Sequence, residues 1–172
     1  VVGTESGLDH SKPLSAFVQG MLQRSGLEIP ESLSSFQVQH ACAGATLSLI
    51  SVGGLLGMSN RSAEAGVVVA TDIAHYETET TAEVTQGAGS VLIETDPRLL
   101  ELDLSTIGFC SRDVDDFFRP LGSATAKVKG RYSMEQYWAN LETAFLDHAQ
   151  RIGELPSEAL EATGFFVLHT PF

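Results

Sequence analysis

A single cysteine, Cys42, lies where a short strand-like run gives way to a helical pattern rich in small residues. At a helix N-terminus, unpaired N–H groups and the positive end of the dipole favour a thiolate, which is a strong nucleophile. The same N–H groups can hold an oxyanion that forms on the group attacked by sulfur. The position predicts a nucleophile at a buried helix start, and the plainer alternative is a small apolar core residue.

Two further side chains with acid–base chemistry follow apolar runs. Glu5 comes after the buried strand predicted at residues 1–3 and before a helical pattern, where α/β folds place functional groups. An acidic residue at a helix start is the alternative for Glu5. His169 is delivered by an apolar run over residues 164–172, which we predict to be a buried strand. His148, by contrast, lies on the apolar face of a helix predicted over residues 132–151, where histidines usually pack or meet solvent.

The elements around Cys42 predict a parallel α/β arrangement. A strand at residues 36–39, the helix after Cys42 and a strand at residues 66–70 form a βαβ unit. The second strand is β-branched and unalternated, which predicts burial on both faces of a sheet. It ends before Asp72, so Tyr76 is expected just beyond it, at the edge where α/β active sites collect.

A glycine-rich stretch at residues 85–90 precedes another apolar run, residues 91–93. It lacks the P-loop lysine and the dinucleotide fingerprint, so we interpret its glycines, Gly87 among them, as allowing close backbone approach around the site. The unalternated run predicts a strand covered on both faces and continued across a partner subunit.

Composition bounds the class of protein. With 172 residues, 43% hydrophobic and 19% charged, the chain can build one sizeable core. A net charge of -12 disfavours a nucleic-acid partner. The cluster of Lys127, Lys129 and Arg131 is the one candidate for binding a polyanion such as coenzyme A, unless it is simply solvated.

The two cysteines predict a reducing, cytoplasmic setting, because they are too few for a disulfide framework and have no metal-ligand spacing. No metal, secretory segment or membrane segment is expected. The chain opens within a strand and stops on a core strand, which predicts a segment of a larger protein or one piece of a split one.

Several short motifs follow one another in the order found in one family: Thr4-Glu5-Ser6 with Asp9 and Lys12, Ala41-Cys42, Ala70-Thr71-Asp72-Ile73-Ala74 with Tyr76, Gln86-Gly87-Ala88-Gly89, Asp116-Phe117-Phe118-Arg119-Pro120, Lys129-Gly130-Arg131-Tyr132-Ser133 and His169-Thr170-Pro171-Phe172. Through them the chain resembles the 3-hydroxy-3-methylglutaryl-CoA synthases of the thiolase superfamily over nearly its whole length. The resemblance implies an α/β thiolase-like fold, a duplicated βαβαβ core in five layers. Residues 1–172 would form a single domain segment, incomplete at both ends, covering most of the first half and the entry to the second.

The same resemblance implies roles for individual residues. Glu5 would be the general acid/base, Cys42 would carry the acetyl group, and His169 would orient the second substrate. Four further residues would bind substrate or support the pocket: Tyr76, Asp72, Asp116 and Gly87.

The implied reaction condenses acetyl-CoA with acetoacetyl-CoA through an acetyl-cysteine intermediate, with coenzyme A thioesters as substrates, no separate cofactor, and a homodimer as the working form. Polyketide β-branching synthases share the same three catalytic residues and act on acceptors bound to an acyl carrier protein. The motifs at residues 117–120 and 129–132 favour the mevalonate-pathway enzyme over them. A non-catalytic half completed by a second chain is the remaining alternative.

Overall fold

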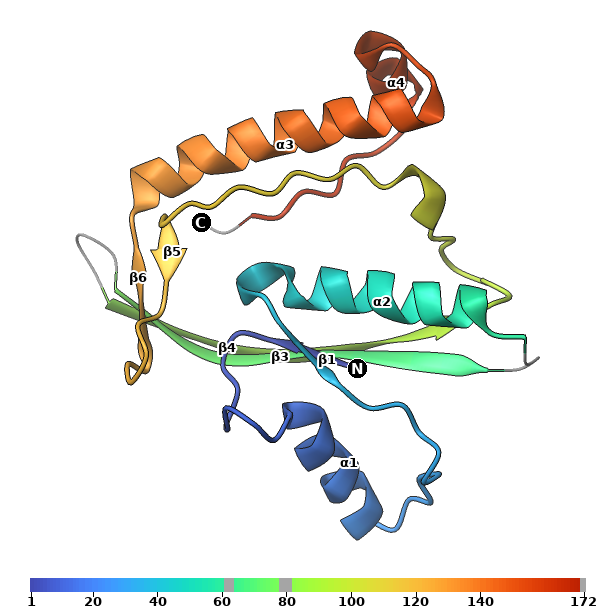
Figure 1. Ribbon diagram of the computed structural model, residues 1–172, viewed down its shortest axis with the longest axis vertical. Coiled ribbons are helices and arrows are strands. Elements are labelled where there is room, and N and C mark those ends of the chain that lie inside the picture. Colours follow the sequence, from blue (N-terminus) through green and yellow to red (C-terminus); the bar gives the residue numbers. More distant parts are fainter. Residues whose placement is uncertain (61–63, 78–81, 171–172) are drawn as a thin grey trace. The chain divides into compact units, whose positions relative to one another are not determined.

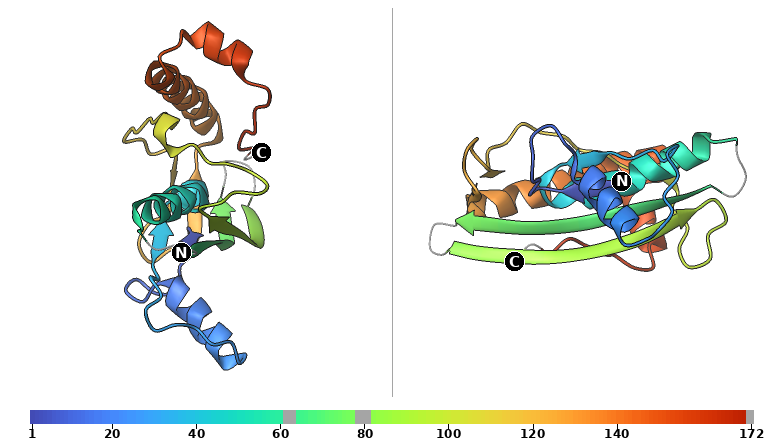
Figure 2. Two further views of the ribbon diagram at one scale, coloured as in Figure 1. Left: turned by 90° about the vertical axis from the view of Figure 1, so that its right-hand side faces the viewer. Right: turned by 90° about the horizontal axis from the view of Figure 1, so that it is seen from below.

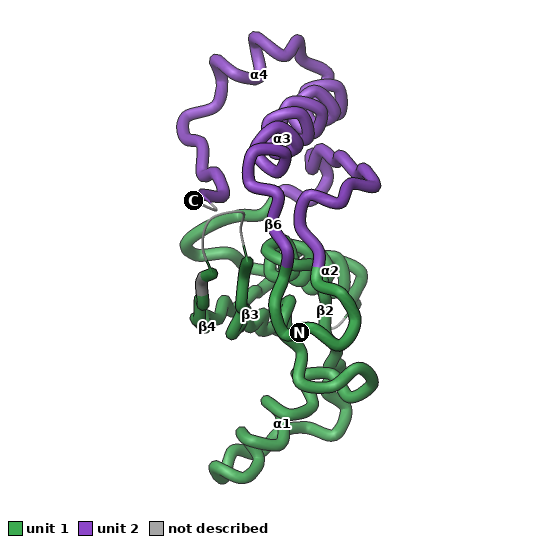
Figure 3. The backbone as a smooth tube through the Cα atoms, turned by 90° about the vertical axis from the view of Figure 1, so that its left-hand side faces the viewer, with its two compact units in different colours: residues 1–102, 119–126 green, residues 103–118, 127–172 purple. Residues whose placement is uncertain are grey.

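The computed structural model describes residues 1–60, 64–77 and 82–170. These residues belong to two compact units, one made of residues 1–102 with 119–126 and the other of residues 103–118 with 127–172 (Figure 3). Each unit is described below by itself. Organisation of the chain as a single domain stays a prediction.

Unit 1 is built on a mixed sheet. The central strand β1, Val2–Thr4, pairs in parallel with β2, Gln37–Gln39, on one side and with β3, Ala65–Glu77, on the other. Strand β4, Ala82–Glu94, runs antiparallel to β3, and the two lie side by side in Figure 2. All three residues of β1 are buried. The predicted strands before Glu5 and before Cys42 are therefore confirmed.

Strand β3 is longer than the sequence pattern indicated, and Tyr76 lies within it, not beyond it. The reason is its antiparallel partner, because the ladder with β4 continues from Ala65, opposite Glu94, to Glu77, opposite Ala82. The prediction that this strand is buried on both faces was also wrong for the described chain. Val68 and Ala74 are buried on one face, whereas Val67 on the other is 49% exposed.

Two helices flank this sheet on opposite sides: α1, Leu14–Arg24, and α2, Gly44–Met58 (Figure 1). Opposite placement follows from the chain path, since it moves outward from β1 to β2 and then crosses back to β3. Helix α2 approaches β1 so closely that a Cβ added at Gly3 would lie 2.4 Å from the Gly44 carbonyl carbon. The small residues at this end of α2 therefore allow it to pack closely on β1.

Residues 41–58 also form the one helix within the described ranges that is long and apolar enough to cross a membrane, with a mean hydropathy of 1.7. Core helices of globular proteins share that property. Helix α2 packs along β1 and β3, and Ser48 and Val52 on it are buried. Of the span from Ala41 to Met58, 17% is buried, so this chain alone covers a minor part of its apolar surface.

Unit 2 is largely helical. Its main helix α3, Gly130–Ile152, is followed by the short helix α4, Pro156–Ala162, and packs on a 3₁₀ turn, η2, Leu104–Thr106. Strand β5, Phe117–Phe118, pairs antiparallel with the end of β6, Thr125–Val128, which leads into α3. The predicted helix over residues 132–151 is confirmed.

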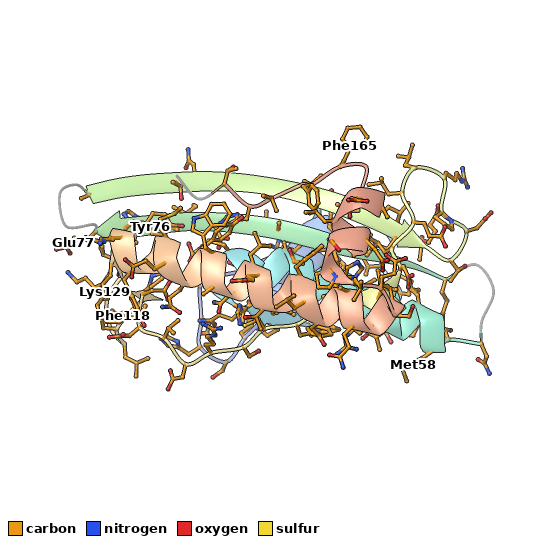
Figure 4. The ribbon with its side chains drawn as sticks, turned by 90° about the horizontal axis from the view of Figure 1, so that it is seen from above. Met58, Tyr76, Glu77, Phe118, Lys129 and Phe165 are labelled. Atoms are coloured by element: carbon orange, nitrogen blue, oxygen red, sulfur yellow. The ribbon has the colours of Figure 1, made fainter. Side chains whose placement is uncertain are left out.

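The segment after α4 contradicts the sequence pattern. Residues 163–170 form no helix or strand, and residues 171–172 lie outside the described ranges. Phe165 is 93% exposed and projects from the ribbon in Figure 4, and Val167 is 96% exposed. An apolar run becomes a strand only when a neighbouring strand pairs with its backbone, and no strand of the described residues pairs with this run. The buried strand predicted there was wrong.

Candidate active site

Glu5 follows β1 directly and is held by the neighbouring strand. Oδ1 of Asp72, on β3, accepts four hydrogen bonds from the turn that carries Glu5. They come from Thr4 Oγ1 at 2.6 Å, Glu5 N at 2.8 Å, Ser6 N at 3.1 Å and Ser6 Oγ at 2.8 Å. A carboxylate that accepts this many donors fixes the backbone around it, so Asp72 sets the direction in which Glu5 points.

The Glu5 side chain is buried, at 6% exposure. Its Oε1 accepts a hydrogen bond from the Tyr76 hydroxyl and lies 3.9 Å from Nη2 of Arg119. Arg119 Nη1 also donates to the Glu5 main-chain carbonyl at 2.5 Å. Oε2 is buried and has no hydrogen-bond partner within the described part of the chain. One carboxylate oxygen is thus engaged and the other is left for chemistry.

Tyr76 is suited to act as the donor in this arrangement. Burial, together with the hydrogen bond to Glu5, raises the pKa of Tyr76 to about 12. The hydroxyl therefore keeps its proton at neutral pH. Its place in strand β3, labelled in Figure 4, is what brings it back to Glu5 across the sheet.

Cys42 enters the site through a strained turn. Ala41 adopts a positive φ of 37°, which turns the chain out of β2 into the 3₁₀ turn η1, Ala41–Ala43, and then into α2. Gly44 meets the end of β1, because a Cβ added at Gly44 would lie 3.0 Å from Thr4 N. Cys42 is a free cysteine and its side chain is exposed, which corrects the expectation of a buried position.

The electrostatics of Cys42 also differ from the sequence-based expectation. Partial desolvation raises the pKa of the Cys42 thiol, and the negative charges of Glu5 and Asp72 raise it further, against an opposing backbone hydrogen bond. Desolvation and the two nearby carboxylates thus outweigh the backbone hydrogen bond that lowers the pKa, and the resting form of Cys42 is the thiol. The proton has to leave when Cys42 attacks.

Gly87 lies on β4, where its Cα is the ladder partner of Asp72. A shallow depression in unit 1 is lined there by Thr71, Asp72, Thr85, Gln86 and Gly87, among others. A Cβ added at Gly87 would meet no heavy atom within 4 Å. The expected close backbone approach at this glycine is therefore not present among the described residues.

The other predicted residues belong to unit 2. Asp116 Oδ2 accepts a hydrogen bond from Ser133 Oγ at 2.8 Å, which ties it to the first turn of α3. His169 lies in the irregular segment after α4, where its main-chain carbonyl accepts a hydrogen bond from the Tyr137 hydroxyl at 3.0 Å. The structure therefore brings Glu5, Cys42, Asp72 and Tyr76 together in unit 1 and places Asp116 and His169 in unit 2.

The basic cluster of Lys127, Lys129 and Arg131 also belongs to unit 2. Lys129 and Arg131 each form an ion pair with an acidic side chain. Lys129 Nζ lies 2.5 Å from Asp115 Oδ2, and its ammonium holds the pKa of the Asp115 carboxyl below the ordinary value. Arg131 pairs with Glu135 one helical turn later. These pairs leave less positive charge for a polyanion than the sequence suggested.

Arg119 is the functional candidate that sequence reasoning gave no role. It lies 114 positions from Glu5 in an irregular segment, so no periodicity links the two residues. The signal that could have found it is a lone arginine within an apolar context, Phe117-Phe118-Arg119-Pro120, since a buried arginine needs a carboxylate or carbonyl partner.

Comparisons with known proteins place this geometry in context. The chain is 34% identical over 173 residues to hydroxymethylglutaryl-CoA synthase of Haloferax volcanii, and 32% identical over 176 residues to the enzyme of that name from Enterococcus faecalis. Each match covers 99% of this chain, but 38% and 43% of the respective relative. The polyketide biosynthesis 3-hydroxy-3-methylglutaryl-ACP synthase of Bacillus subtilis is 28% identical over 183 residues, covering 98% of this chain and 41% of that protein.

The fold agrees with these relatives. The solved structure of MvaS in complex with 3-hydroxy-3-methylglutaryl coenzyme A superposes with a TM-score of 0.78 at 37% identity, covering 87% of this chain and 35% of that one. No family model matches the sequence. The α/β architecture is therefore a part of a thiolase-like fold, as the motifs predicted, and the chain belongs to the hydroxymethylglutaryl-CoA synthase family.

Proposed function

We propose that this chain carries the acyl-transfer and proton-abstraction site of an enzyme that condenses acetyl-CoA with acetoacetyl-CoA to 3-hydroxy-3-methylglutaryl-CoA. The observation that carries the proposal is the buried Glu5 carboxylate beside Cys42, held by Asp72, Tyr76 and Arg119. Coenzyme A thioesters are the substrates in this proposal, and no further cofactor is required.

In the first step, Cys42 sulfur attacks the acetyl carbonyl of acetyl-CoA. A bond forms between Cys42 sulfur and the acetyl carbon, the bond to coenzyme A sulfur breaks, and the thiol proton ends on the departing coenzyme A. The main-chain N–H groups at the start of α2 are the donors for the oxyanion that forms on the way. Cys42 is exposed, as a residue that meets a large substrate must be.

In the second step, Glu5 removes a proton from the methyl group of the acetyl held on Cys42. The resulting enolate carbon attacks the ketone carbon of acetoacetyl-CoA and forms the new carbon–carbon bond, and the alkoxide takes up a proton. Carboxylates act as bases on carbon when they are held close and dry, and Glu5 is buried. Water then releases the product from Cys42 sulfur.

His169 has the proposed role of donating a hydrogen bond to the ketone of the second substrate. Asp116 is proposed to be a supporting polar residue for substrate binding. Asp116 is tied to Ser133 at the start of α3, so its part would be to support neighbouring elements rather than to react. Gly87, opposite Asp72 on β4, is proposed to border the substrate at the depression between these strands.

A second candidate function differs from the first in the acceptor substrate, the molecule whose ketone is attacked. The likeness to a 3-hydroxy-3-methylglutaryl-ACP synthase supports an acceptor tethered to an acyl carrier protein, with the same roles for Glu5, Cys42 and His169. Identity is higher to the two relatives named for the coenzyme A product, and on that ground we favour free acetoacetyl-CoA.

A homodimer and a cytoplasmic location belong to the same proposal. Both cysteines are free, which agrees with a reducing compartment. The run over residues 91–93 was expected to be covered on both faces, but Val91 and Leu92 are about half exposed in this chain. Light scattering tests the dimer, and a monomer mass at every concentration would refute it.

The test of the proposed function is a two-stage incubation. Acetyl-CoA alone should add one acetyl group to the peptide that contains Cys42, and acetoacetyl-CoA added afterwards should remove it with formation of 3-hydroxy-3-methylglutaryl-CoA. Turnover that appears only with an acceptor on a carrier protein would select the second function. No acetylated peptide with either acceptor present would refute both.

A further inference from the structure

Arg119 contacts the proposed base at two points. Its Nη1 donates to the Glu5 main-chain carbonyl at 2.5 Å, and its Nη2 lies 3.9 Å from Oε1 of the Glu5 carboxylate. Both residues belong to unit 1. The guanidinium therefore holds the backbone of Glu5 by a hydrogen bond and faces its carboxylate as a positive charge.

Two nitrogens of the Arg119 guanidinium form no hydrogen bond among the described residues, and this bears on the role of Arg119. Its Nε and Nη2 are buried without a hydrogen-bond partner among the described residues. A guanidinium retained for stability is normally satisfied by several acceptors, since each buried donor left unpaired costs free energy. Among the described residues, the hydrogen bond and the ion pair of the group both go to Glu5, which points to a role exercised through that residue.

The two oxygens of Glu5 are consequently unequal. Oε1 accepts from the Tyr76 hydroxyl and faces the Arg119 charge, whereas Oε2 is buried and unpartnered within the described chain. A carboxylate oxygen that already accepts a hydrogen bond from a group holding its proton is the poorer base. Oε2 has its lone pairs free to accept a proton from carbon.

We propose that Arg119 is a positioning residue that, together with Tyr76, fixes the Glu5 carboxylate through Oε1 and so makes Oε2 the atom that removes the methyl proton. The proton moves from the acetyl methyl carbon to Oε2, the electron pair of the broken bond stays on the enolate, and no other reactant is needed. This inference rests on the proposed function and adds to it a residue and an atom.

The experiment compares Arg119→Met and Arg119→Lys with wild-type protein and with Arg24→Met, a charge-removing control at an exposed arginine of α1. Three quantities are measured: the rate of acetylation of the Cys42 peptide by acetyl-CoA, the rate at which solvent deuterium enters the methyl group of that acetyl, and kcat and KM for acetoacetyl-CoA. Deuterium entry reports proton removal by Glu5 directly.

The proposal expects Arg119→Met to acetylate at close to the wild-type rate while deuterium entry and kcat fall roughly 100-fold, with KM unchanged, because a base displaced by about 1 Å loses on that order. Arg119→Lys keeps the positive charge but places it on a single nitrogen, which cannot contact the Glu5 backbone and carboxylate at two separate points. It should therefore recover part of the lost rate. Arg24→Met should match wild type. In a Glu5→Gln background, Arg119→Met should cause no further loss.

Three results would overturn the inference. Deuterium entry at the wild-type rate in Arg119→Met would mean that Arg119 does not position the base. Losses that add in the double variant would mean that it acts elsewhere. An equal fall in acetylation, deuterium entry and thermal midpoint in Arg119→Met, with no recovery in Arg119→Lys, would mean a purely structural role. Wild-type protein that fails to acetylate Cys42 would instead refute the proposed function, and the inference with it.

Discussion

The carboxyl end of β1 and the segment after α4 both carry a residue proposed to be catalytic, yet they are held in very different ways. The Glu5 main chain is held by Asp72 and Arg119, and its Oε1 accepts a hydrogen bond from Tyr76, all within unit 1. His169 lies in an exposed, irregular segment of unit 2 and is tied by its main-chain carbonyl to Tyr137.

The two regions differ in which interactions determine their structure. The contacts of Glu5 with Asp72 and Tyr76 come from β3, which pairs with β1, so they form when those two strands pair. Residues 163–170 pair with no strand of the described chain, and among them His169 is tied through its main-chain carbonyl to Tyr137. Changes at the first region should therefore affect both structure and chemistry, and changes at the second should affect chemistry alone.

The largest expected effect is at the nucleophile. Cys42→Ala should lower turnover by more than about 10⁴-fold, because no other group can carry the acyl intermediate. Cys110→Ala is the matched control, since Cys110 is the other free cysteine and belongs to unit 2. Steady-state assays of both variants check the prediction, and equal activity of Cys42→Ala and Cys110→Ala would contradict it.

Glu5→Ala should cost the condensation about 10³-fold while acetylation of Cys42 persists. The carboxylate acts on the methyl proton, and its negative charge is one cause of the raised pKa of the Cys42 thiol. Removing that charge makes the thiol more acidic, which favours acylation. Separate measurement of the two half-reactions tests this, and an equal fall in both would show that Glu5 only maintains structure.

His169→Ala should lower condensation by about 10²-fold, as loss of one donor to a developing oxyanion does, and weaken acetoacetyl-CoA binding. Acetyl-enzyme should still form on Cys42. The exposed segment predicts an unchanged thermal midpoint, and this is the sharpest contrast with the Glu5 region. A lowered midpoint would break the comparison between the two regions.

Asp72→Ala should lower the free energy of unfolding by about 2 kcal/mol, because Thr4 and Ser6 donors lose their acceptor. Asp96→Ala, at an exposed carboxylate of unit 1, is the control and should leave stability unchanged. Denaturant titration of both variants measures the effect. Equal stability of the two would mean that Asp72 does not hold the turn around Glu5.

The smallest effect is a shift in pH dependence. Because desolvation and, after it, the charge of Glu5 raise the pKa of the Cys42 thiol, alkylation of Cys42 by iodoacetamide should accelerate only at a pH above that at which an ordinary cysteine reacts. In Glu5→Gln the midpoint, the pH at which the alkylation rate is half-maximal, should be lower, since the repulsive negative charge is gone. A midpoint that stays in place, measured on the Cys42 peptide, would show that the two groups do not interact.

The sequence predicted the local part of this arrangement well. The strands around Glu5 and Cys42, the helix that begins after Cys42 and the long helix α3 follow from short-range periodicity and are confirmed. The pairing of β3 with β4 was harder, because antiparallel continuation of a ladder through polar and glycine residues leaves no apolar pattern to read. Tyr76 was consequently placed beyond a strand that in fact contains it.

The candidate site was predictable to the same extent. Glu5, Asp72 and Tyr76 converge as expected, because they follow or lie on adjacent parallel strands. Arg119 comes from a distant irregular segment, so its contact with Glu5 is a property of the tertiary structure. The direction of the Cys42 pKa shift was missed for a related reason, since it comes from desolvation and from the charges of Glu5 and Asp72, which are distant in sequence.

The measurement that tests the central claim most directly is peptide mass analysis after brief incubation of wild-type protein with acetyl-CoA. The proposed mechanism predicts one acetyl group on the peptide that contains Cys42, none on the peptide that contains Cys110, and loss of the label when acetoacetyl-CoA is added. Acetylation that persists in Cys42→Ala, or product formation with no acetylated intermediate, would contradict it.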